Sequence, residues 1–385
     1  MPYIANRTVF DADSHVMELP GWLESYADTK TASAIRPLAL GGAGALAERA
    51  VAEAAERAAE GTTLVAELDP LEVLQPKGWS AHGAFDREQR TKVLDALGFE
   101  AQLVFPTFAP TQFAGTDLDL LYGGTDALNR AMADFCSRDP RLLAVGAVPW
   151  GHPARTIASA RAAIHAGCAA LQVHSSLTSG VVGPTHPDHQ PLWALLEEHN
   201  IPAVTHIGGG GRPVQRAMHD NGITVTDFLG GGENIRSKDY LGVHQRTEVF
   251  WGAMIFDGMF EQFPGLRAAS IEEGALWVAP WLRRIDMAQR TFGKTESVLR
   301  DLPMKPSEYV HRHMRFTPFP GEPIDWLIDS CGDDLFMFSS DYPHPEGTRD
   351  PQRRFEQTIG DVTEATRERF YAGNFAELYR GAVPV

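Results

Sequence analysis

The sequence from residue 85 onward alternates regularly between short apolar runs and longer segments with the periodicity of helices. Together with a first apolar run near the N-terminus, this alternation predicts eight strands, at 8–13, 101–105, 142–148, 169–174, 202–206, 266–272, 314–318 and 335–340. A helix is predicted after each strand, at 86–98, 125–138, 154–166, 190–199, 247–263, 275–289, 323–331 and 352–371. The regular alternation implies parallel strands with helical crossovers, and eight repeats predict an α/β fold closed into a (β/α)8 barrel.

An open, doubly wound sheet is the alternative architecture. Such a sheet usually carries a glycine-rich phosphate-binding loop directly after its first strand. Here the first strand is followed by Ser14, His15, Val16 and Met17, which do not form such a loop. The barrel is therefore the favoured prediction.

Two long segments do not fit the alternation. Residues 21–84 include an alanine-rich stretch, 42–60, that predicts a helix with one solvated side. We interpret 21–84 as an insertion that caps the mouth of the barrel, with a plain surface extension as the alternative. The connection 208–246 is too long for a simple link and predicts a lid. The whole chain, 1–385, is then expected to form one domain.

Composition limits the partners and the compartment. The 385 residues carry a formal charge of −16, which makes nucleic acid and anionic membranes poor partners but leaves small anionic substrates open. We find no apolar run long enough to cross a bilayer and no secretory signal at the N-terminus. Cys136, Cys168 and Cys331 have no paired spacing, which predicts free thiols in a reducing, cytoplasmic compartment.

Ionisable side chains stand at the C-terminal ends of several predicted strands. Because all these ends meet on one face of a parallel barrel, the side chains are expected to lie together. Nitrogen and oxygen ligands of this kind suit zinc, with manganese or iron as alternatives. In chain order the candidates are Asp13, His15, His174, His206, Glu272, Asp341 and His344.

Four of these residues are predicted to ligate one divalent cation, namely Asp13, His15, His206 and Asp341. A set of four leaves an open position for water or substrate, as a catalytic site requires. Buried aspartates would also be costly without a cation or hydrogen bonds. Asp11 points to the same side but lies deeper, and we expect it to hydrogen-bond to the backbone. His174 fits a core position as well as it fits a catalytic one.

A run of glycines, 208–211, precedes Arg212 and Pro213. The run lacks the lysine and the hydroxyl residue of a P-loop, so a phosphate-binding loop is disfavoured. We predict instead a flexible loop that lets Arg212 approach the site and pair with a carboxylate of the substrate.

Several stretches are similar to one known family: DADSHVME at 11–18, GAFDREQRTKVLDALGFEAQLVFPT at 83–107, DFCSRDPRLLAVGAVP at 134–149, THIG at 205–208, EEGALWVAPWLRRID at 272–286, SSDYPHPEG at 339–347 and GNFAELY at 373–379. The chain resembles the amidohydrolase-related metal-dependent hydrolases, in the branch of aminocarboxymuconate-semialdehyde decarboxylase and γ-resorcylate decarboxylase. The resemblance covers most of the chain outside 21–84. It implies a distorted (β/α)8 barrel, one divalent metal, usually zinc or manganese, and often a homodimer. The positions that match the family's ligands are Asp13, His15, His206 and Asp341.

Two positions depart from the family's pattern. The first ligand is often His or Glu in the family, and here it is Asp13. The sixth strand often ends in a histidine that handles water or substrate, and here Glu272 stands at that point. The end of the fourth strand offers Gln172 and His174 but no lysine that could be carbamylated, which predicts a mononuclear site.

These inferences predict a metal-assisted reaction on a small, carboxylated, aromatic or dienoic compound. Glu272 or His344 is expected to move a proton, and Arg212 or His174 to orient the substrate. Protonation of carbon would give non-oxidative decarboxylation, whereas attack of water on a carbonyl would give hydrolysis. The resemblance favours the first outcome and Glu272 favours the second. A non-catalytic barrel scaffold is a third hypothesis, and the presence of all four candidate ligands counts against it.

Overall fold

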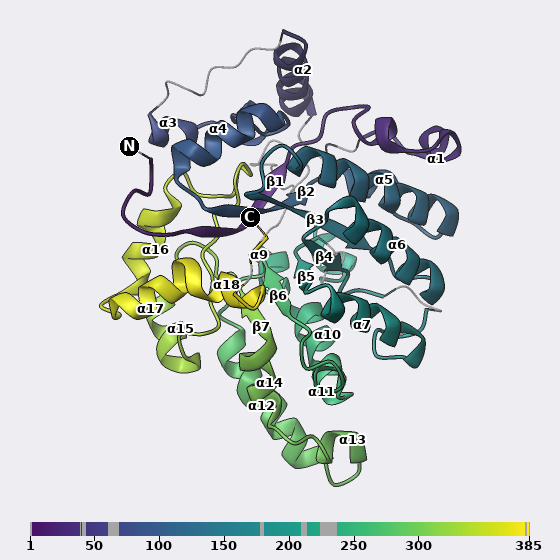
Figure 1. Ribbon diagram of the computed structural model, residues 1–385, viewed down its shortest axis with the longest axis vertical. Coiled ribbons are helices and arrows are strands. Elements are labelled where there is room, and N and C mark those ends of the chain that lie inside the picture. Colours follow the sequence, from purple (N-terminus) through teal and green to yellow (C-terminus); the bar gives the residue numbers. More distant parts are fainter. Residues whose placement is uncertain are drawn as a thin grey trace.

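A parallel sheet that curls in chain order forms the centre of the molecule. The computed structural model describes residues 2–38, 40, 44–60, 69–177, 181–208, 214–223, 237–381 and 383–384. Within them, seven strands pair in the order β1 to β7, each parallel to the next. Figure 1 shows the strands curling in this order with the helices outside them. The strands are Phe10–Val16 (β1), Ala101–Pro106 (β2), Leu142–Val148 (β3), Ala170–Val173 (β4), Ala203–His206 (β5), Ala268–Ile271 (β6) and Met314–Phe316 (β7).

The eighth predicted strand, 335–340, does not form a regular strand. It is joined to its neighbours by isolated bridges, of Phe336 with Phe316 in β7 and of Tyr342 with Ser14 in β1. These bridges close the ring between β7 and β1, so the fold is a distorted (β/α)8 barrel.

Backbone conformation explains why the eighth segment ends as extended chain at Asp341. Asp341 has a φ of 51°, which is outside the range of a strand. Pro343 follows two residues later and has no N–H to donate to a ladder. The departure from a regular strand therefore falls directly at the end that carries Asp341 and His344.

Helices cover the outer side of the sheet. Those that alternate with the strands are α4 (Arg87–Leu97), α5 (Leu118–Cys136), α6 (Pro153–Ala166), α7 (Gln190–Glu198), α10 (Gln245–Phe256), α12 (Val278–Phe292), α15 (Ile324–Cys331) and α16 (Pro351–Ile359). Helix α4 agrees closely with its prediction, because Asp86 accepts the N–H groups of Glu88 and Gln89 at its start and Gly98 ends it in the left-handed conformation.

Two predicted helices are divided. The helix expected at 247–263 is split into α10 and α11 (Met259–Gln262) by Gly258, whose φ is 73°. The helix expected at 352–371 is split into α16 and α17 (Glu364–Glu368), with Gly360 at a φ of 65° between them. Glycine adopts these angles without steric cost, so both helices stop there. A π-helical turn over Arg369–Gly373 and α18 (Asn374–Leu378) complete the C-terminal part.

The described parts of the two long segments carry helices. Segment 21–84 holds α1 (Thr29–Ala34), α2 (Gly44–Glu60), which agrees with the helix predicted at 42–60, and α3 (Pro70–Val73). Connection 208–246 holds α8 (Arg216–His219) and α9 (Ser237–Tyr240), while 209–213 and 224–236 lie outside the described residues. Helices α13 (Ser297–Arg300) and α14 (Pro306–His313) precede β7.

The end of segment 21–84 is fixed beside the ends of β1 and the eighth segment. The N–H of Gly78 donates to the carbonyl of Pro343 at 2.7 Å, and the N–H of Met17 donates to the carbonyl of Ala84 at 2.8 Å. Trp79 adds a hydrogen bond from Nε1 to the carbonyl of Glu18 at 3.0 Å.

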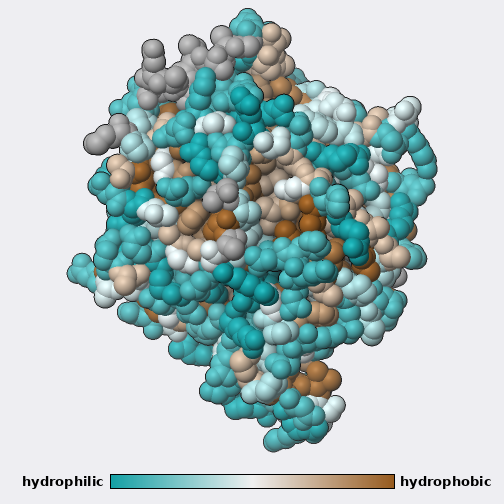
Figure 2. All heavy atoms as spheres, viewed as in Figure 1, coloured by the Kyte–Doolittle hydropathy of each residue, from teal (hydrophilic) through white to brown (hydrophobic). Residues whose placement is uncertain are grey.

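Apolar side chains fill the interior of the barrel. This cluster contains Ala12, Ala101, Leu103, Phe105, Leu143, Val145, Ala170, Val204, Ala269, Ile271 and Met337, joined by Phe375, Leu378 and Tyr379 from the C-terminal part. A larger apolar cluster packs the strands against the helices. Figure 2 shows a face that is hydrophilic over much of its area, with hydrophobic residues gathered toward its middle. Among the described helices, none has the length and apolar character needed to span a membrane.

Candidate metal centre

Six ionisable side chains meet where the strands end. Each is at most 8% exposed. They form two overlapping groups of four, and within each group one ligand atom per residue lies within 4.8 Å of the others. The first group is Asp13, His15, His206 and Glu272, and the second is His15, Glu272, Asp341 and His344. Because the groups share two members, all six side chains belong to one cluster.

Short distances between ring nitrogens and carboxylate oxygens define the centre of the cluster. His15 Nε2 lies 3.2 Å from Asp13 Oδ1 and 3.6 Å from Asp341 Oδ1. His206 Nε2 lies 3.4 Å from the same Asp13 oxygen and 3.3 Å from Glu272 Oε2. Each imidazole therefore presents one nitrogen to two carboxylates at once.

Two buried polar atoms at this centre show whether the site suits a metal ion. His15 Nε2 and Asp341 Oδ1 are buried and make no hydrogen bond within the described part of the chain. Buried polar atoms normally have a hydrogen-bond partner or a metal ion, so the lone pairs of these two atoms need an acceptor. A divalent cation accepts lone pairs from nitrogen and oxygen alike, and zinc and manganese both take such ligands. The side chains present therefore fit a divalent metal ion.

The charges of the cluster shift the pKa values of its members in different directions. Burial raises the pKa of Asp13, but the imidazoles of His15 and His206 close to its carboxylate outweigh burial and hold the pKa below its usual range. Burial raises the pKa of Asp341 to about 6, although the neighbouring His344 lowers it in part. Burial and the charge of His344 hold the pKa of His15 well below its ordinary value. His15 is thereby kept as the neutral imidazole that a metal ion requires.

Two carboxylates of the cluster stand on strained backbone. Glu272 and Asp341 have φ values of 54° and 51°, in the left-handed region that non-glycine residues rarely occupy. Hydrogen bonds hold both residues there, from Glu272 N–H to Thr317 Oγ1 at 2.8 Å and from Asp341 N–H to the Asp13 carbonyl at 2.9 Å. Such conformations cost roughly 1–3 kcal/mol each and concentrate at functional sites.

Comparison with known proteins assigns the family. The family model described as Amidohydrolase matches residues 10–381, which is nearly the whole chain. The chain belongs to the Amidohydrolase family. It is accordingly a metal-dependent enzyme of the amidohydrolase superfamily, and the resemblance predicted from sequence is confirmed.

Solved structures of similar proteins share the fold of this amidohydrolase. An amidohydrolase from Mycobacterium avium subsp. paratuberculosis is 19% identical with a TM-score of 0.73, over 98% of this chain and 100% of that one. A dihydroxybenzoic acid decarboxylase from Polaromonas, with bound manganese and 2-nitroresorcinol as inhibitor, is 17% identical with a TM-score of 0.63 over 97% of each chain. A 5-carboxyvanillate decarboxylase from Novosphingobium aromaticivorans, complexed with manganese and 4-hydroxy-3-methoxy-5-nitrobenzoic acid, is 18% identical with a TM-score of 0.63, over 97% of this chain and 96% of that one.

The amidohydrolase brings together most of the residues selected from sequence. The four candidate ligands and both candidate proton carriers lie in the cluster. His174 belongs to neither group, and its backbone carbonyl accepts a hydrogen bond from Trp150 Nε1 at 2.8 Å. Arg212 lies outside the described residues.

Asp11 does not join the cluster. Its carboxylate accepts the N–H groups of Ser340 at 2.7 Å and Asp13 at 3.3 Å, so the predicted bonding to backbone is confirmed. The register of β1 against β2 shifts between Asp11 and Ser14. This irregularity separates Asp11 from Asp13 and His15, with which it was expected to share a side of the strand.

Sequence reasoning missed Thr107, which directly follows β2. Its Oγ1 lies 3.0 Å from His344 Nε2 and 3.5 Å from His15 Nδ1, so one hydroxyl contacts two imidazoles of the cluster. Only ionisable residues at strand ends were considered as candidates. The available signal was the position of Thr107 as the first polar residue after the second strand.

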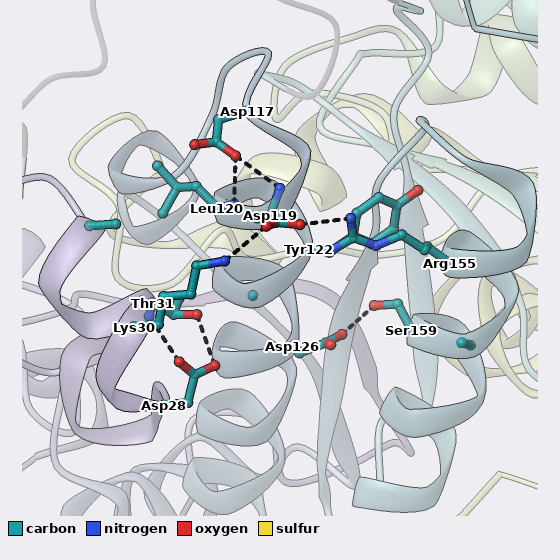
Figure 3. A pocket seen from close by; sticks show the side chains of 13 residues that line it. Asp28, Lys30, Thr31, Asp117, Asp119, Leu120, Tyr122, Asp126, Arg155 and Ser159 are labelled. Atoms are coloured by element: carbon teal, nitrogen blue, oxygen red, sulfur yellow. Dashed lines mark hydrogen bonds and ion pairs between the residues drawn. The ribbon is translucent and has the colours of Figure 1, made fainter.

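A separate pocket of about 400 Å³ lies on the outside of the barrel between α1, α5 and α6. Figure 3 shows that its charged side chains bind one another: Asp119 accepts from Lys30 at 2.9 Å and from Arg155 at 3.1 Å, and Asp126 accepts from Ser159. None of the cluster residues lines this pocket. Its carboxylates already accept hydrogen bonds from neighbouring side chains or from the first turns of α1 and α5, so it does not resemble a second centre.

Proposed function

We propose that this amidohydrolase is a metal-dependent, non-oxidative decarboxylase that cleaves the carbon–carbon bond to a carboxylate in a small aromatic or dienoic compound. The observation that carries the proposal is the buried convergence of carboxylates and imidazoles where the barrel strands end. The proposal is also supported by two proteins of similar fold that contain bound manganese. One is a dihydroxybenzoic acid decarboxylase and the other a 5-carboxyvanillate decarboxylase.

The proposed ligands of a single divalent ion are Asp13, His15, His206 and Asp341. We propose zinc, which nitrogen and oxygen donors suit, with manganese or iron as alternatives. When bound, such an ion would polarise an oxygen atom of the substrate.

Glu272 and His344 are the proposed proton carriers. Glu272 Oε2 lies 3.3 Å from His206 Nε2, and His344 Nδ1 lies 2.9 Å from Asp341 Oδ1. Both side chains are buried, so a proton that they hold is shielded from bulk water. In decarboxylation one of them gives its proton to the substrate carbon as the bond to the carboxyl carbon breaks and carbon dioxide leaves. We propose that Arg212 pairs with the substrate and that His174 orients it.

Hydrolysis is the second candidate function, and Glu272 is the observation that favours it. A carboxylate at the edge of the cluster is a suitable general base for a water molecule that attacks a carbonyl carbon. The two reactions differ in the fate of water, because hydrolysis adds an oxygen atom to the product and decarboxylation does not.

The remaining assignments are part of the same proposal. The chain is proposed to form one domain over 1–385, in which 21–84 caps the mouth and 208–246 acts as a lid. The hydrogen bonds of Gly78 and Trp79 beside the cluster support the cap. All three cysteines are free and buried, which supports a reducing, cytoplasmic compartment. A homodimer is proposed from the resemblance to the family.

Product analysis tests the proposal. Protein loaded with zinc or manganese is incubated with 2,6-dihydroxybenzoate and with 5-carboxyvanillate in water enriched in oxygen-18, and Asp341→Asn serves as the inactive control. Release of carbon dioxide with no label in the aromatic product supports decarboxylation. Esters and amides are incubated in the same way. Label in the product from one of them would replace decarboxylation with hydrolysis as the proposed reaction.

A further inference from the structure

Glu273 directly follows Glu272 but belongs to neither group of the metal cluster. Its side chain is buried, and three hydroxyls bond to its carboxyl group. Ser270 Oγ donates to Oε2 at 2.5 Å, Thr247 Oγ1 donates to Oε1 at 2.6 Å and Thr205 Oγ1 donates to Oε2 at 3.1 Å. The proposed reaction assigns no role to this buried group.

The three hydroxyls come from three different elements. Thr205 lies in β5, Ser270 lies in β6 and Thr247 lies in α10. Thr205 and Ser270 are partners in the register of β5 against β6. The residues that precede them in each strand fill the barrel interior, so alternation directs the two hydroxyls to the outer side, where α10 packs. Glu273 therefore links two neighbouring strands to the helix that covers them.

The link does not depend on whether Glu273 is ionised. Burial raises the pKa of Glu273 to about 7, although the three hydroxyls lower it in part. A carboxylate accepts all three hydrogen bonds, whereas a protonated carboxyl group donates one of them and accepts the others. Both forms therefore keep the three contacts.

The turn after β6 places Glu272 and Glu273 on opposite sides of the sheet from those that a strand would give. Ile271, the last residue of β6, fills the barrel interior, so a continued strand would direct Glu272 outward and Glu273 inward. The φ of 54° at Glu272 breaks this alternation. Glu272 Oε2 lies instead 3.3 Å from His206 Nε2 in the cluster, and Glu273 turns back beside Ser270.

This turn is held from two sides. A residue other than glycine keeps a left-handed conformation only where the surrounding structure compensates its cost. The N–H of Glu272 donates to Thr317 Oγ1 at 2.8 Å, which holds the turn from the end of β7. The three hydrogen bonds of Glu273 hold it from β5, β6 and α10. Their loss would release this second side and let Glu272 move relative to His206.

We propose that Glu273 is a positioning residue that fixes Glu272 against His206 by anchoring the turn after β6. The inference rests on the proposed function in that Glu272 is taken to transfer a proton. Glu273 acts through the backbone of the turn, and it contacts neither the substrate nor the metal ion in this proposal.

The test compares four variants. Glu273→Gln keeps a carbonyl acceptor and an N–H donor for the hydroxyls, whereas Glu273→Met keeps the length of the side chain and loses all three hydrogen bonds. The double variant Thr247→Val with Ser270→Ala leaves Glu273 in place and removes its two shortest hydrogen bonds. The matched control is Thr156→Val with Ser159→Ala, which removes two buried hydroxyls of α6.

Two kinds of measurement are made on each variant. Crystal structures give the φ of Glu272 and the distance from its Oε2 to His206 Nε2. The constants kcat and KM are measured for zinc- or manganese-loaded protein with 2,6-dihydroxybenzoate and with 5-carboxyvanillate, and metal content is measured on the same preparations. Circular dichroism confirms that each variant is folded.

Glu273→Met and the double variant of Thr247 and Ser270 are expected to displace Glu272 by about 1 Å and to lower kcat about ten- to a hundred-fold. KM and metal content should stay nearly unchanged, because the substrate and the proposed ligands lose no contact. Glu273→Gln and the control should match the unmodified protein in structure and in kcat.

An unmoved Glu272 in the folded Glu273→Met variant would overturn the proposal, and so would a Glu273→Gln variant as impaired as Glu273→Met. If Glu273→Met does not fold, the double variant of Thr247 and Ser270 is judged by the same criterion. A wild-type crystal structure in which Glu273 lacks the three hydroxyl contacts would also overturn the proposal, and this result needs no variant to fold. Displacement of Glu272 without decarboxylation of any substrate by the unmodified protein would sink the proposed function and leave the anchoring role of Glu273 standing.

Discussion

Ser340 donates two hydrogen bonds to Asp11, from its N–H to Oδ1 at 2.7 Å and from its hydroxyl to Oδ2 at 2.6 Å, across 329 positions of sequence. Gln102 donates a further bond to Asp11 at 2.7 Å, and it accepts one from the buried guanidinium of Arg90 at 3.2 Å. This network ties β1, β2 and the eighth segment together immediately beside the cluster. It keeps Asp341, the neighbour of Ser340, at a fixed distance from β1.

Replacing Asp11 with alanine should cost much more stability than replacing Ser340 with alanine. Asp11→Ala leaves several buried donors without an acceptor and is expected to lower the free energy of unfolding by about 3 kcal/mol. Ser340→Ala removes one hydroxyl and is expected to lower it by about 1 kcal/mol. Urea denaturation of both variants measures the difference, and equal losses would contradict the account.

Arg90 should be intolerant even of lysine. Its guanidinium, fully buried, donates to the carbonyls of His15 at 3.2 Å and Gly83 at 3.4 Å as well as to Gln102. Lysine lacks the planar fork that reaches these acceptors together, so Arg90→Lys and Arg90→Met are both expected to lose about 3 kcal/mol. Thermal denaturation checks this expectation.

The control for Arg90 is Arg138→Met, which removes an exposed ion pair with Glu88. Exposed pairs contribute about 1 kcal/mol or less, so the control should differ little from the unmodified protein. A lysine variant at position 90 that is as stable as this control would show that the fork is not needed.

Glu272→Gln separates proton transfer from metal binding. If Glu272 carries a proton, the variant should keep its metal and lose about 10²- to 10⁴-fold in kcat. Asp341→Asn, by contrast, is expected to lose the metal itself. Metal content and turnover are measured on the same preparations, and loss of the metal from Glu272→Gln would make Glu272 a ligand instead.

Protonation of the buried His313 should destabilise the protein in acid. Burial lowers the pKa of His313 from 6.5 to about 4, and its Nδ1 bonds to the Leu266 carbonyl at 2.7 Å. A histidine whose pKa is lower in the folded state stabilises the protein above pH 6.5, and this contribution is lost as the pH falls toward 4. The loss amounts to about 3 kcal/mol.

His313→Gln removes this titration and keeps an N–H donor for Leu266. The free energy of unfolding is measured for both proteins between pH 7 and pH 4.5. The unmodified protein should lose more stability over this range than the variant does. Parallel pH profiles would show that His313 does not titrate as described.

Much of the barrel could be predicted from sequence because each repeat carries its own local signals. Asp86 and Gly98 mark both ends of α4, and apolar runs mark each strand. The convergence of the ionisable side chains was predictable for a related reason. A charged residue at the end of a buried strand, such as Asp13 or His206, has few acceptable environments other than a site.

The features that escaped prediction depend on contacts between distant residues. The left-handed conformation of Asp341 is stabilised by a hydrogen bond to the carbonyl of Asp13, and no neighbouring residue in the sequence indicates it. The register shift after Asp11 likewise depends on the pairing of β1 with β2. Thr107 has no charge, so its contacts with two imidazoles emerge only from the folded arrangement.

The metal content of the purified protein tests the central claim most directly. Wild-type protein and the variants Asp13→Asn, His206→Asn and Asp341→Asn are loaded with zinc or manganese, freed of excess metal and analysed by inductively coupled plasma mass spectrometry. The account predicts one tightly held divalent ion per wild-type chain and loss of that ion in each folded variant. Wild-type protein that retains no metal, or variants that retain it fully, would contradict the account.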